Sequence, residues 1–99
     1  MIETLKEALL SGHTVAFTYG DKQRVVEVHA VGHSTKDGSL VMRGFQVAGE
    51  RNGWALFTLD KMEALTPALM PLSEAPRPGF AAGDKQMSQV LFEVETENV

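Results

Sequence analysis

The sequence predicts a mainly β protein of the α+β class, in which an N-terminal helix is followed by a small five-stranded barrel. Residues 2–11 carry apolar side chains at helical spacing, and residues 13–66 form alternating, β-branched segments divided by polar turns. Ninety-nine residues suffice for one compact core but not for two. We therefore expect a single domain with a capping helix (1–12), a barrel (13–66) and a C-terminal extension (67–99).

The helix predicted over residues 2–11 has one apolar face, formed by Ile2, Leu5, Ala8 and Leu9. Gly12 is a natural stop signal after it. A ten-residue helix is too short to be stable alone, so it must pack on the strands, where it would cover one open end of the barrel.

Alternation and turn signals divide the middle of the chain into five strands, at residues 13–19, 23–33, 40–47, 54–59 and 62–66. Asp37-Gly38 is a strong signal for a two-residue hairpin turn. Gly32 and Gly44 lie inside strands, where glycine marks kinks or bulges that let a sheet curl. Short strands of this kind predict a strongly bent barrel of the Sm or SH3 type, whose closure removes exposed edges.

The C-terminal third is rich in proline and less regular. Four prolines predict an irregular, partly extended stretch over residues 67–83: Pro67, Pro71, Pro76 and Pro78. Two patterns then overlap, helical spacing at Met87, Val90, Leu91 and Val94, and alternation at Val90, Phe92 and Val94. We expect a short helix that opens at Asp84 and turns into a strand, with residues 95–99 frayed.

Composition excludes several classes of protein. The apolar content of 43% and charged content of 22% are ordinary for a soluble globular protein. No apolar run is long enough to span a membrane, and the charged first helix is not a signal peptide. The chain has no cysteine, which rules out disulfides and thiolate metal sites and fits a cytoplasmic location.

The negative charge is concentrated at the C-terminal end. The chain carries a net −4, and residues 63–99 alone hold two basic and six acidic side chains. Long-range attraction to nucleic acid normally needs a clear basic excess. A nucleotide or short oligonucleotide held by a local cluster is therefore the nucleic-acid ligand that this chain could take.

Two polar side chains stand among aliphatic residues. His29 can donate to a phosphate or sugar and stack on a base, or it can be a buried histidine bonded to a backbone carbonyl. The planar guanidinium of Arg43 suits a phosphate, because burying its charge is costly without an anion. The alternative for Arg43 is an internal ion pair with Glu27 or Asp60.

Aromatic residues offer a second kind of contact. Trp54, with Tyr19 and Phe45, can form a stacking platform worth about 1–3 kcal/mol per base, or it can belong to the core or an interface. Arg24 and Lys61 are either solvated charges at strand ends or lesser members of a phosphate-binding rim.

The predicted hairpin has a consequence for the candidate site. If Asp37-Gly38 are the central turn residues, His29 lies opposite Gln46 on one face, while Arg43 lies on the other face. His29 and Arg43 share a face only if a bulge near Gly32 or Gly44 shifts the register by one residue.

Catalysis is not expected. His29 and His33 point to one face of a strand, but four residues at about 3.3 Å each separate them by about 13 Å, too far to share a zinc ion. The sequence has no cysteine nucleophile, no nucleophile-elbow serine and no phosphate loop with its lysine. We therefore expect no catalytic residue, metal or cofactor.

Several motifs follow one another in a fixed order: VAFTY (15–19) after a short helix, Arg24 and Val26, EVHAVG (27–32), RGFQ (43–46) and WALFTLDKM (54–62). Over residues 3–66 this set resembles the WYL domain, a bacterial Sm-like barrel best known as the ligand-sensing part of transcription regulators. The tail RPGFAAGDKQM (77–87) is similar to that of small stand-alone proteins with this domain. The resemblance implies a groove that binds a nucleotide or single-stranded nucleic acid through His29 and Arg43.

The leading hypothesis is a non-catalytic, cytoplasmic regulatory module of bacterial or phage type that binds a nucleotide or short single-stranded nucleic acid. Its site would contain His29, Arg43, Gln46 and Trp54, with Tyr19, Arg24 and Lys61 as further members. The alternative is a protein-interaction or homo-oligomerisation module, an accessory subunit without a small ligand. There the proline-rich segment 67–80, with Phe80, would wrap a neighbour. Neither hypothesis involves a membrane.

Overall fold

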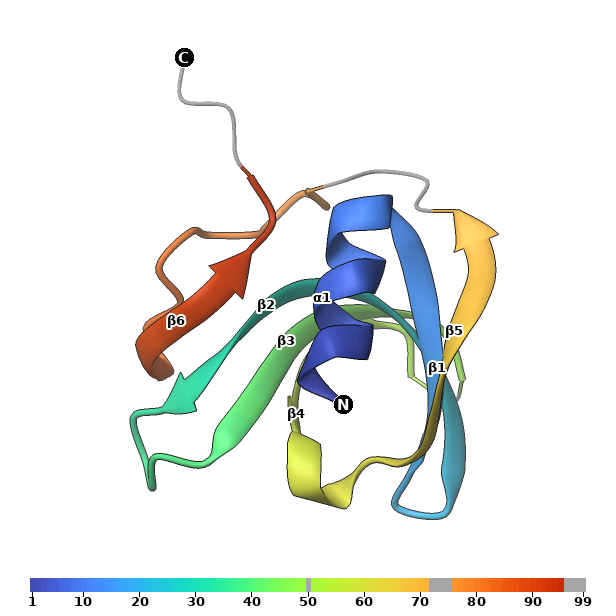
Figure 1. Ribbon diagram of the computed structural model, residues 1–99, viewed down its shortest axis with the longest axis horizontal. Coiled ribbons are helices and arrows are strands. Elements are labelled where there is room, and N and C mark those ends of the chain that lie inside the picture. Colours follow the sequence, from blue (N-terminus) through green and yellow to red (C-terminus); the bar gives the residue numbers. More distant parts are fainter. Residues whose placement is uncertain (50, 72–75, 96–99) are drawn as a thin grey trace.

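The computed structural model of the chain describes residues 1–49, 51–71 and 76–95, which form one helix and one antiparallel sheet (Figure 1). The elements in chain order are α1 (Ile2–Ser11), β1 (His13–Tyr19), β2 (Lys22–Ser34), β3 (Leu40–Ala48), β4 (Gly53–Thr58), the 3-10 helix η1 (Leu59–Lys61), β5 (Glu63–Pro71) and β6 (Met87–Glu93). The predicted helix and the five predicted strands are therefore confirmed to within a few residues, apart from the end of β5.

The six-stranded sheet has the order β4-β3-β2-β1-β5, and β6 also pairs with β2. Strand β2 is long enough to hold three neighbours: β3 lies along one edge, while β1 and β6 share the other. In Figure 1 the sheet curves around α1, and β6 lies beside the end of β2. The C-terminal third of the chain thus contributes β6 to the sheet.

The prediction of a closed barrel is wrong, because β4 and β5 end the sheet and do not pair with each other within the described residues. Helix α1 covers the open side instead, and its Leu5 and Ala8 are completely buried. Since this helix already excludes water from the core, closure of the sheet is not needed for burial.

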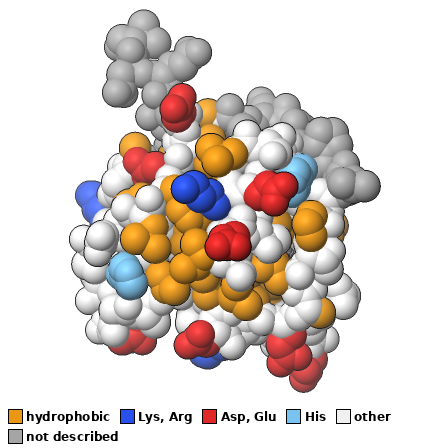
Figure 2. All heavy atoms as spheres, viewed as in Figure 1, with side chains coloured by type: hydrophobic (Ala, Val, Ile, Leu, Met, Phe, Trp, Pro, Cys, Tyr) orange, Lys and Arg blue, Asp and Glu red, His pale blue; other side chains and the backbone are white. Residues whose placement is uncertain are grey.

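The larger core lies between α1 and the sheet and contains Leu5, Ala8, Val15, Phe17, Val26, Val28, Val31, Met42, Phe57, Leu59 and Met62. A smaller cluster of Ala30, Val41 and Met87, with Leu56, Phe80 and Val90 against it, lies on the other face of the sheet. We call this second face the outer face. Figure 2 shows the α1 side, where apolar side chains are spread over the middle with charged side chains among them.

The proline-rich part departs from expectation in two ways. Strand β5 continues past Pro67 to Pro71, which an edge strand tolerates because its outward N–H groups need no partner in the sheet. The helix predicted to open at Asp84 is wrong: residues 84–86 form a turn in which the Met87 N–H donates to the Asp84 carbonyl at 3.0 Å. The alternating pattern was the correct one, since β6 pairs with β2. Residues 72–75 and 96–99, where irregular structure and fraying were expected, lie outside the described residues.

The two-residue turn predicted at Asp37-Gly38 is also wrong. Residues 35–38 form a four-residue connection closed by a 2.8 Å hydrogen bond from the Ser34 N–H to the Ser39 carbonyl. Asp37 stabilises this wider loop, because its carboxylate accepts from the Ser39 N–H at 3.0 Å and from the Ser39 hydroxyl at 2.6 Å. The wider turn shifts the register by two residues, and an irregularity between Val28 and Ala30 shifts it by one more, so Gln46 lies opposite Val26 and not opposite His29.

Candidate ligand-binding site

A β-bulge brings His29 to the outer face. Val28 lies opposite Gly44 and Ala30 lies opposite Arg43, which leaves His29 as the extra residue of β2. This is the shift that the sequence required for His29 and Arg43 to share a face. The ring of His29 is completely buried and lies 4.7 Å from the Trp54 ring, centroid to centroid.

Residues 76–86, which we call the strap, lie across the outer face between β5 and β6. Phe80 of the strap stacks on Trp54, with ring centroids 6.1 Å apart and planes 29° apart, and also contacts His29. The indole N–H of Trp54 donates to the Pro78 carbonyl at 3.3 Å. Phe80, which the alternative hypothesis assigned to a neighbouring molecule, thus packs against its own chain.

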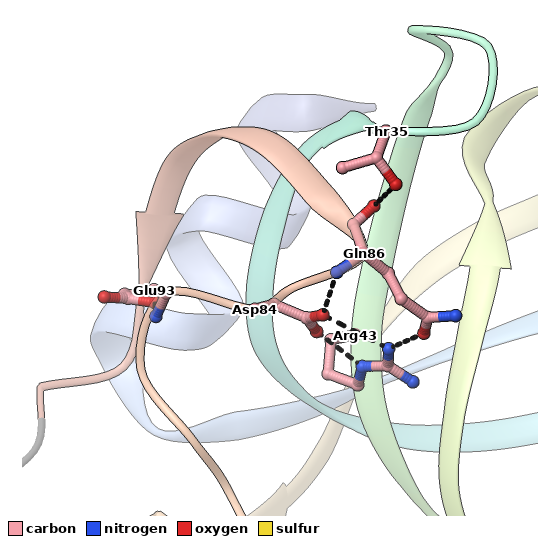
Figure 3. Close-up of polar contacts among 6 residues, drawn as sticks. Thr35, Arg43, Asp84, Gln86 and Glu93 are labelled. Carbon is pink, nitrogen blue, oxygen red and sulfur yellow. Dashed lines mark hydrogen bonds and ion pairs between the residues drawn. The ribbon is translucent and has the colours of Figure 1, made fainter.

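Arg43 is paired with an acid of the strap. Its Nε donates to Asp84 Oδ2 at 2.7 Å, and its Nη2 donates to Asp84 Oδ1 at 3.4 Å and to the side-chain oxygen of Gln86 (Figure 3). The hydrogen bond from Arg43 is the main cause that lowers the pKa of the Asp84 carboxyl, against a smaller opposing effect of burial. An internal ion pair was one of the two alternatives for Arg43, but its partner is Asp84 rather than Glu27 or Asp60.

A second ion pair holds the other end of the strap. The Glu27 carboxylate is almost fully buried and accepts from Arg77 Nε at 2.6 Å and from Arg77 Nη2 at 3.1 Å. The Arg77 guanidinium also lies 4.6 Å from the centroid of the Phe45 ring, a favourable cation–π distance. Because a buried carboxylate is costly without a partner, Glu27 depends on Arg77 for its stability in this position.

His29 completes this attachment as a neutral side chain. Its Nε2 accepts from the Arg77 backbone N–H at 3.1 Å, so the ring proton is on Nδ1, which donates to the Glu27 carbonyl at 3.0 Å. Burial is the main cause that lowers the pKa of His29 below 6.5, partly offset by the bond to the Glu27 carbonyl. The backbone-bonded, buried alternative for His29 is therefore the one that the structure shows.

The remaining predicted site residues lie elsewhere. Arg24 Nη1 donates to Gln46 Oε1 at 3.1 Å and its Nη2 to the Tyr19 carbonyl at 3.3 Å, so these three form a separate group. The ring of Tyr19 belongs to the main core, where it makes edge contacts with Phe17 and Phe57. Lys61 is exposed in η1. Of the seven predicted residues, Arg43 and Trp54 line one pocket, and His29 contacts Trp54 beside it.

The strap and the sheet line a partly open pocket of about 310 Å³. Arg43 and Trp54 line it from the sheet, and residues 79–85 line it from the strap. Sequence reasoning missed the strap residues Arg77, Phe80, Asp84 and Lys85 as parts of a site. The available signal was the tail RPGFAAGDKQM, which combines both kinds of charge with Gly79 and Gly83 in a stretch without periodicity.

Two further features, a metal centre and a membrane-spanning helix, are absent from the described part of the chain. There, no group of three or more histidine, aspartate or glutamate side chains could hold a metal ion. No helix in the same residues is long and apolar enough to cross a membrane.

Comparison with known proteins identifies one family. The model of the WYL domain matches residues 1–67, from α1 into β5, and ends before the strap and β6. No curated protein and no solved structure matches the chain. The matched part covers most of the sheet and both residues that line the pocket from it.

Proposed function

Since the chain belongs to the WYL domain family, whose members are in general regulatory, non-catalytic modules that bind ligands, we propose that it binds a nucleotide or a short single-stranded nucleic acid. The ligand lies in the pocket under the strap. Arg43 contacts its phosphate and Trp54 its base, while His29 holds the strap in place through Arg77.

The observation that carries this proposal is that Arg43 and Trp54 line the same pocket. A guanidinium forms bidentate hydrogen bonds with phosphate, and an indole ring stacks on any base. The volume of about 310 Å³ is at the lower end of the range for small-molecule sites. A ligand that combines an anion with an aromatic ring matches both groups at once.

The charges around the pocket favour an anion only locally. Arg43 and Lys85 are positive and Asp84 is negative, while the whole chain carries a net −4. Attraction at long range is therefore weak, and affinity depends on direct contacts inside the pocket. We expect binding of a single nucleotide to depend less on salt than binding of an extended strand does.

The test uses Trp54, the only tryptophan of the chain, whose fluorescence reports directly on the pocket. ADP and an oligothymidylate are titrated against the wild type, Arg43→Gln and Lys61→Gln. Both variants remove one positive charge. The last residue of β4, Thr58, is about 13 Å along the strand from Trp54, and Lys61 lies beyond it in η1.

We expect saturable quenching and a raised melting temperature for the wild type and Lys61→Gln, and neither for Arg43→Gln. If ADP and the oligonucleotide leave the wild type unchanged at millimolar concentration, the proposed function is wrong. Equal losses in the two variants would show that only total charge matters and would exclude the pocket as the site.

A further inference from the structure

The strap presents to the sheet the two chemical groups that a nucleotide would present. The Asp84 carboxylate lies on the Arg43 guanidinium at 2.7 Å, where a phosphate would bind. The Phe80 ring is stacked on Trp54, where a base would bind. An anion and an aromatic ring of the chain itself therefore occupy the contact groups of the proposed site.

The two ends of the strap are held with different strength. At one end Arg77 is 22% exposed but the Glu27 side chain is only 2% exposed, so separation of the pair would leave a buried carboxylate without a partner. At the other end the side chains of Arg43 and Asp84 are 19% and 11% exposed, and water can reach both. An ion pair that water can reach separates at lower cost than one with a fully buried member.

Asp84 also keeps a hydrogen bond when it leaves Arg43. Its Oδ1 accepts from the Gln86 N–H at 2.9 Å, a contact within the turn that does not involve the sheet. Gly79 comes directly before Phe80 and Gly83 directly before Asp84, with φ of +95° and +67°, conformations that glycine adopts without strain. Backbone rotation at these two glycines can therefore reorient Phe80 and Asp84 while Arg77 and β6 stay in place.

We infer that Asp84 and Phe80 act as a built-in substitute ligand, which an incoming aromatic anion displaces from Arg43 and Trp54 while the Arg77 end of the strap stays attached. This inference rests on the proposed function, because it concerns the same pocket. Affinity is then set by a competition, since ligand binds only to the fraction of molecules whose strap has released Arg43. Binding also changes the surface of the strap, and a partner protein could distinguish the ligand-bound state from the free state by this change.

The test compares Asp84→Asn with Asp37→Asn. The two aspartates are matched, because each accepts a hydrogen bond from the backbone N–H two residues further on, at 2.9 Å for Asp84 and 3.0 Å for Asp37. Asparagine preserves that turn contact and removes one negative charge in both variants. Asp37 lies in the β2–β3 connection and does not line the pocket.

We expect Asp84→Asn to bind ADP about three- to tenfold more tightly than the wild type, and Asp37→Asn to bind with wild-type affinity. Wild-type binding with no gain in Asp84→Asn would overturn the inference and leave the proposed function standing. Absence of binding in the wild type and in both variants would overturn the proposed function, and the inference with it.

Hydrogen exchange gives a second readout. The Phe80 N–H donates to the Arg77 carbonyl within the strap, and the Arg77 N–H donates to His29. With saturating ADP the exchange of the Phe80 N–H should become faster, while the Arg77 N–H stays protected. Slower exchange at both positions would show that the strap closes over the ligand instead of yielding to it, and would overturn the inference.

Discussion

Replacing Arg77 with methionine should destabilise the protein severely, because the change leaves Glu27 without its partner. The Glu27 side chain is 2% exposed and loses two charge-assisted hydrogen bonds, of 2.6 and 3.1 Å. Removing one member of a buried ion pair costs about 3–5 kcal/mol. Methionine also removes the cation–π contact of the guanidinium with Phe45, which contributes about 0.5–1 kcal/mol, so the larger part of the loss is that of the uncompensated carboxylate.

The same reasoning predicts that a second substitution restores stability. In the double variant Glu27→Leu/Arg77→Met no charge remains to be buried, and apolar replacement of a buried pair is often neutral or stabilising. Urea unfolding followed by circular dichroism measures the free energy of unfolding of the wild type, both single variants and the double variant. Arg51→Met, in the exposed β3–β4 connection, serves as the control and should change stability by less than about 0.5 kcal/mol.

Two results would refute this reasoning. A loss below about 1 kcal/mol in Arg77→Met would mean that water reaches the Glu27 carboxylate once the guanidinium is gone. A double variant no more stable than Arg77→Met would mean that the loss comes from packing of the strap and not from the buried charge.

Three further predictions concern stability. Because the pKa of His29 is lower in the folded protein, the unfolded chain binds a proton at this residue at a higher pH than the folded protein does. The contribution of His29 to stability should therefore be complete above pH 6.5 and fall as the pH drops towards the native pKa. In urea unfolding from pH 8 to 5, His29→Asn should make the midpoint less dependent on pH. Gly44→Ala should cost about 1–3 kcal/mol in urea unfolding, since its Cβ would lie 2.3 Å from Val26 Cγ1; wild-type stability would show that β2 and β3 can move apart. Leu5→Ala should lower the free energy of unfolding by about 2–5 kcal/mol in the same assay. Leu10→Ala is the control and should change it little, because the Leu10 side chain is 73% exposed. Equal effects would mean that α1 does not pack on the sheet as described.

The secondary structure was predictable because it depends on local patterns. Alternation located the strands, and the apolar face of residues 2–11 located the helix. Closure of the sheet was not predictable in this way, because it depends on whether α1 or a pairing of β4 with β5 covers the core. The prediction of a two-residue turn at Asp37-Gly38 was wrong because the same residues also fit a wider loop. The Asp37 side chain stabilises that loop through its hydrogen bonds with Ser39.

The candidate site was predictable only from the side of the sheet. His29, Arg43 and Trp54 could be recognised as polar or aromatic residues in otherwise aliphatic strands. Their partners could not be assigned, because Arg43 and Asp84 are 41 residues apart and Glu27 and Arg77 are 50 apart. No periodicity relates positions so distant across an irregular, proline-rich stretch, and only tertiary packing brings them together.

The position of β6 on β2 bears on how the protein can be shortened. A fragment that ended with the family match at residue 67 would leave the edge of β2 from Ala30 to Ser34 bare. Unpaired strand edges recruit the strands of other molecules, so such a fragment should aggregate even though it retains the whole segment that matches the family. Expression of the isolated family segment would therefore measure the solubility that the last third of the chain provides, and would reveal little about binding.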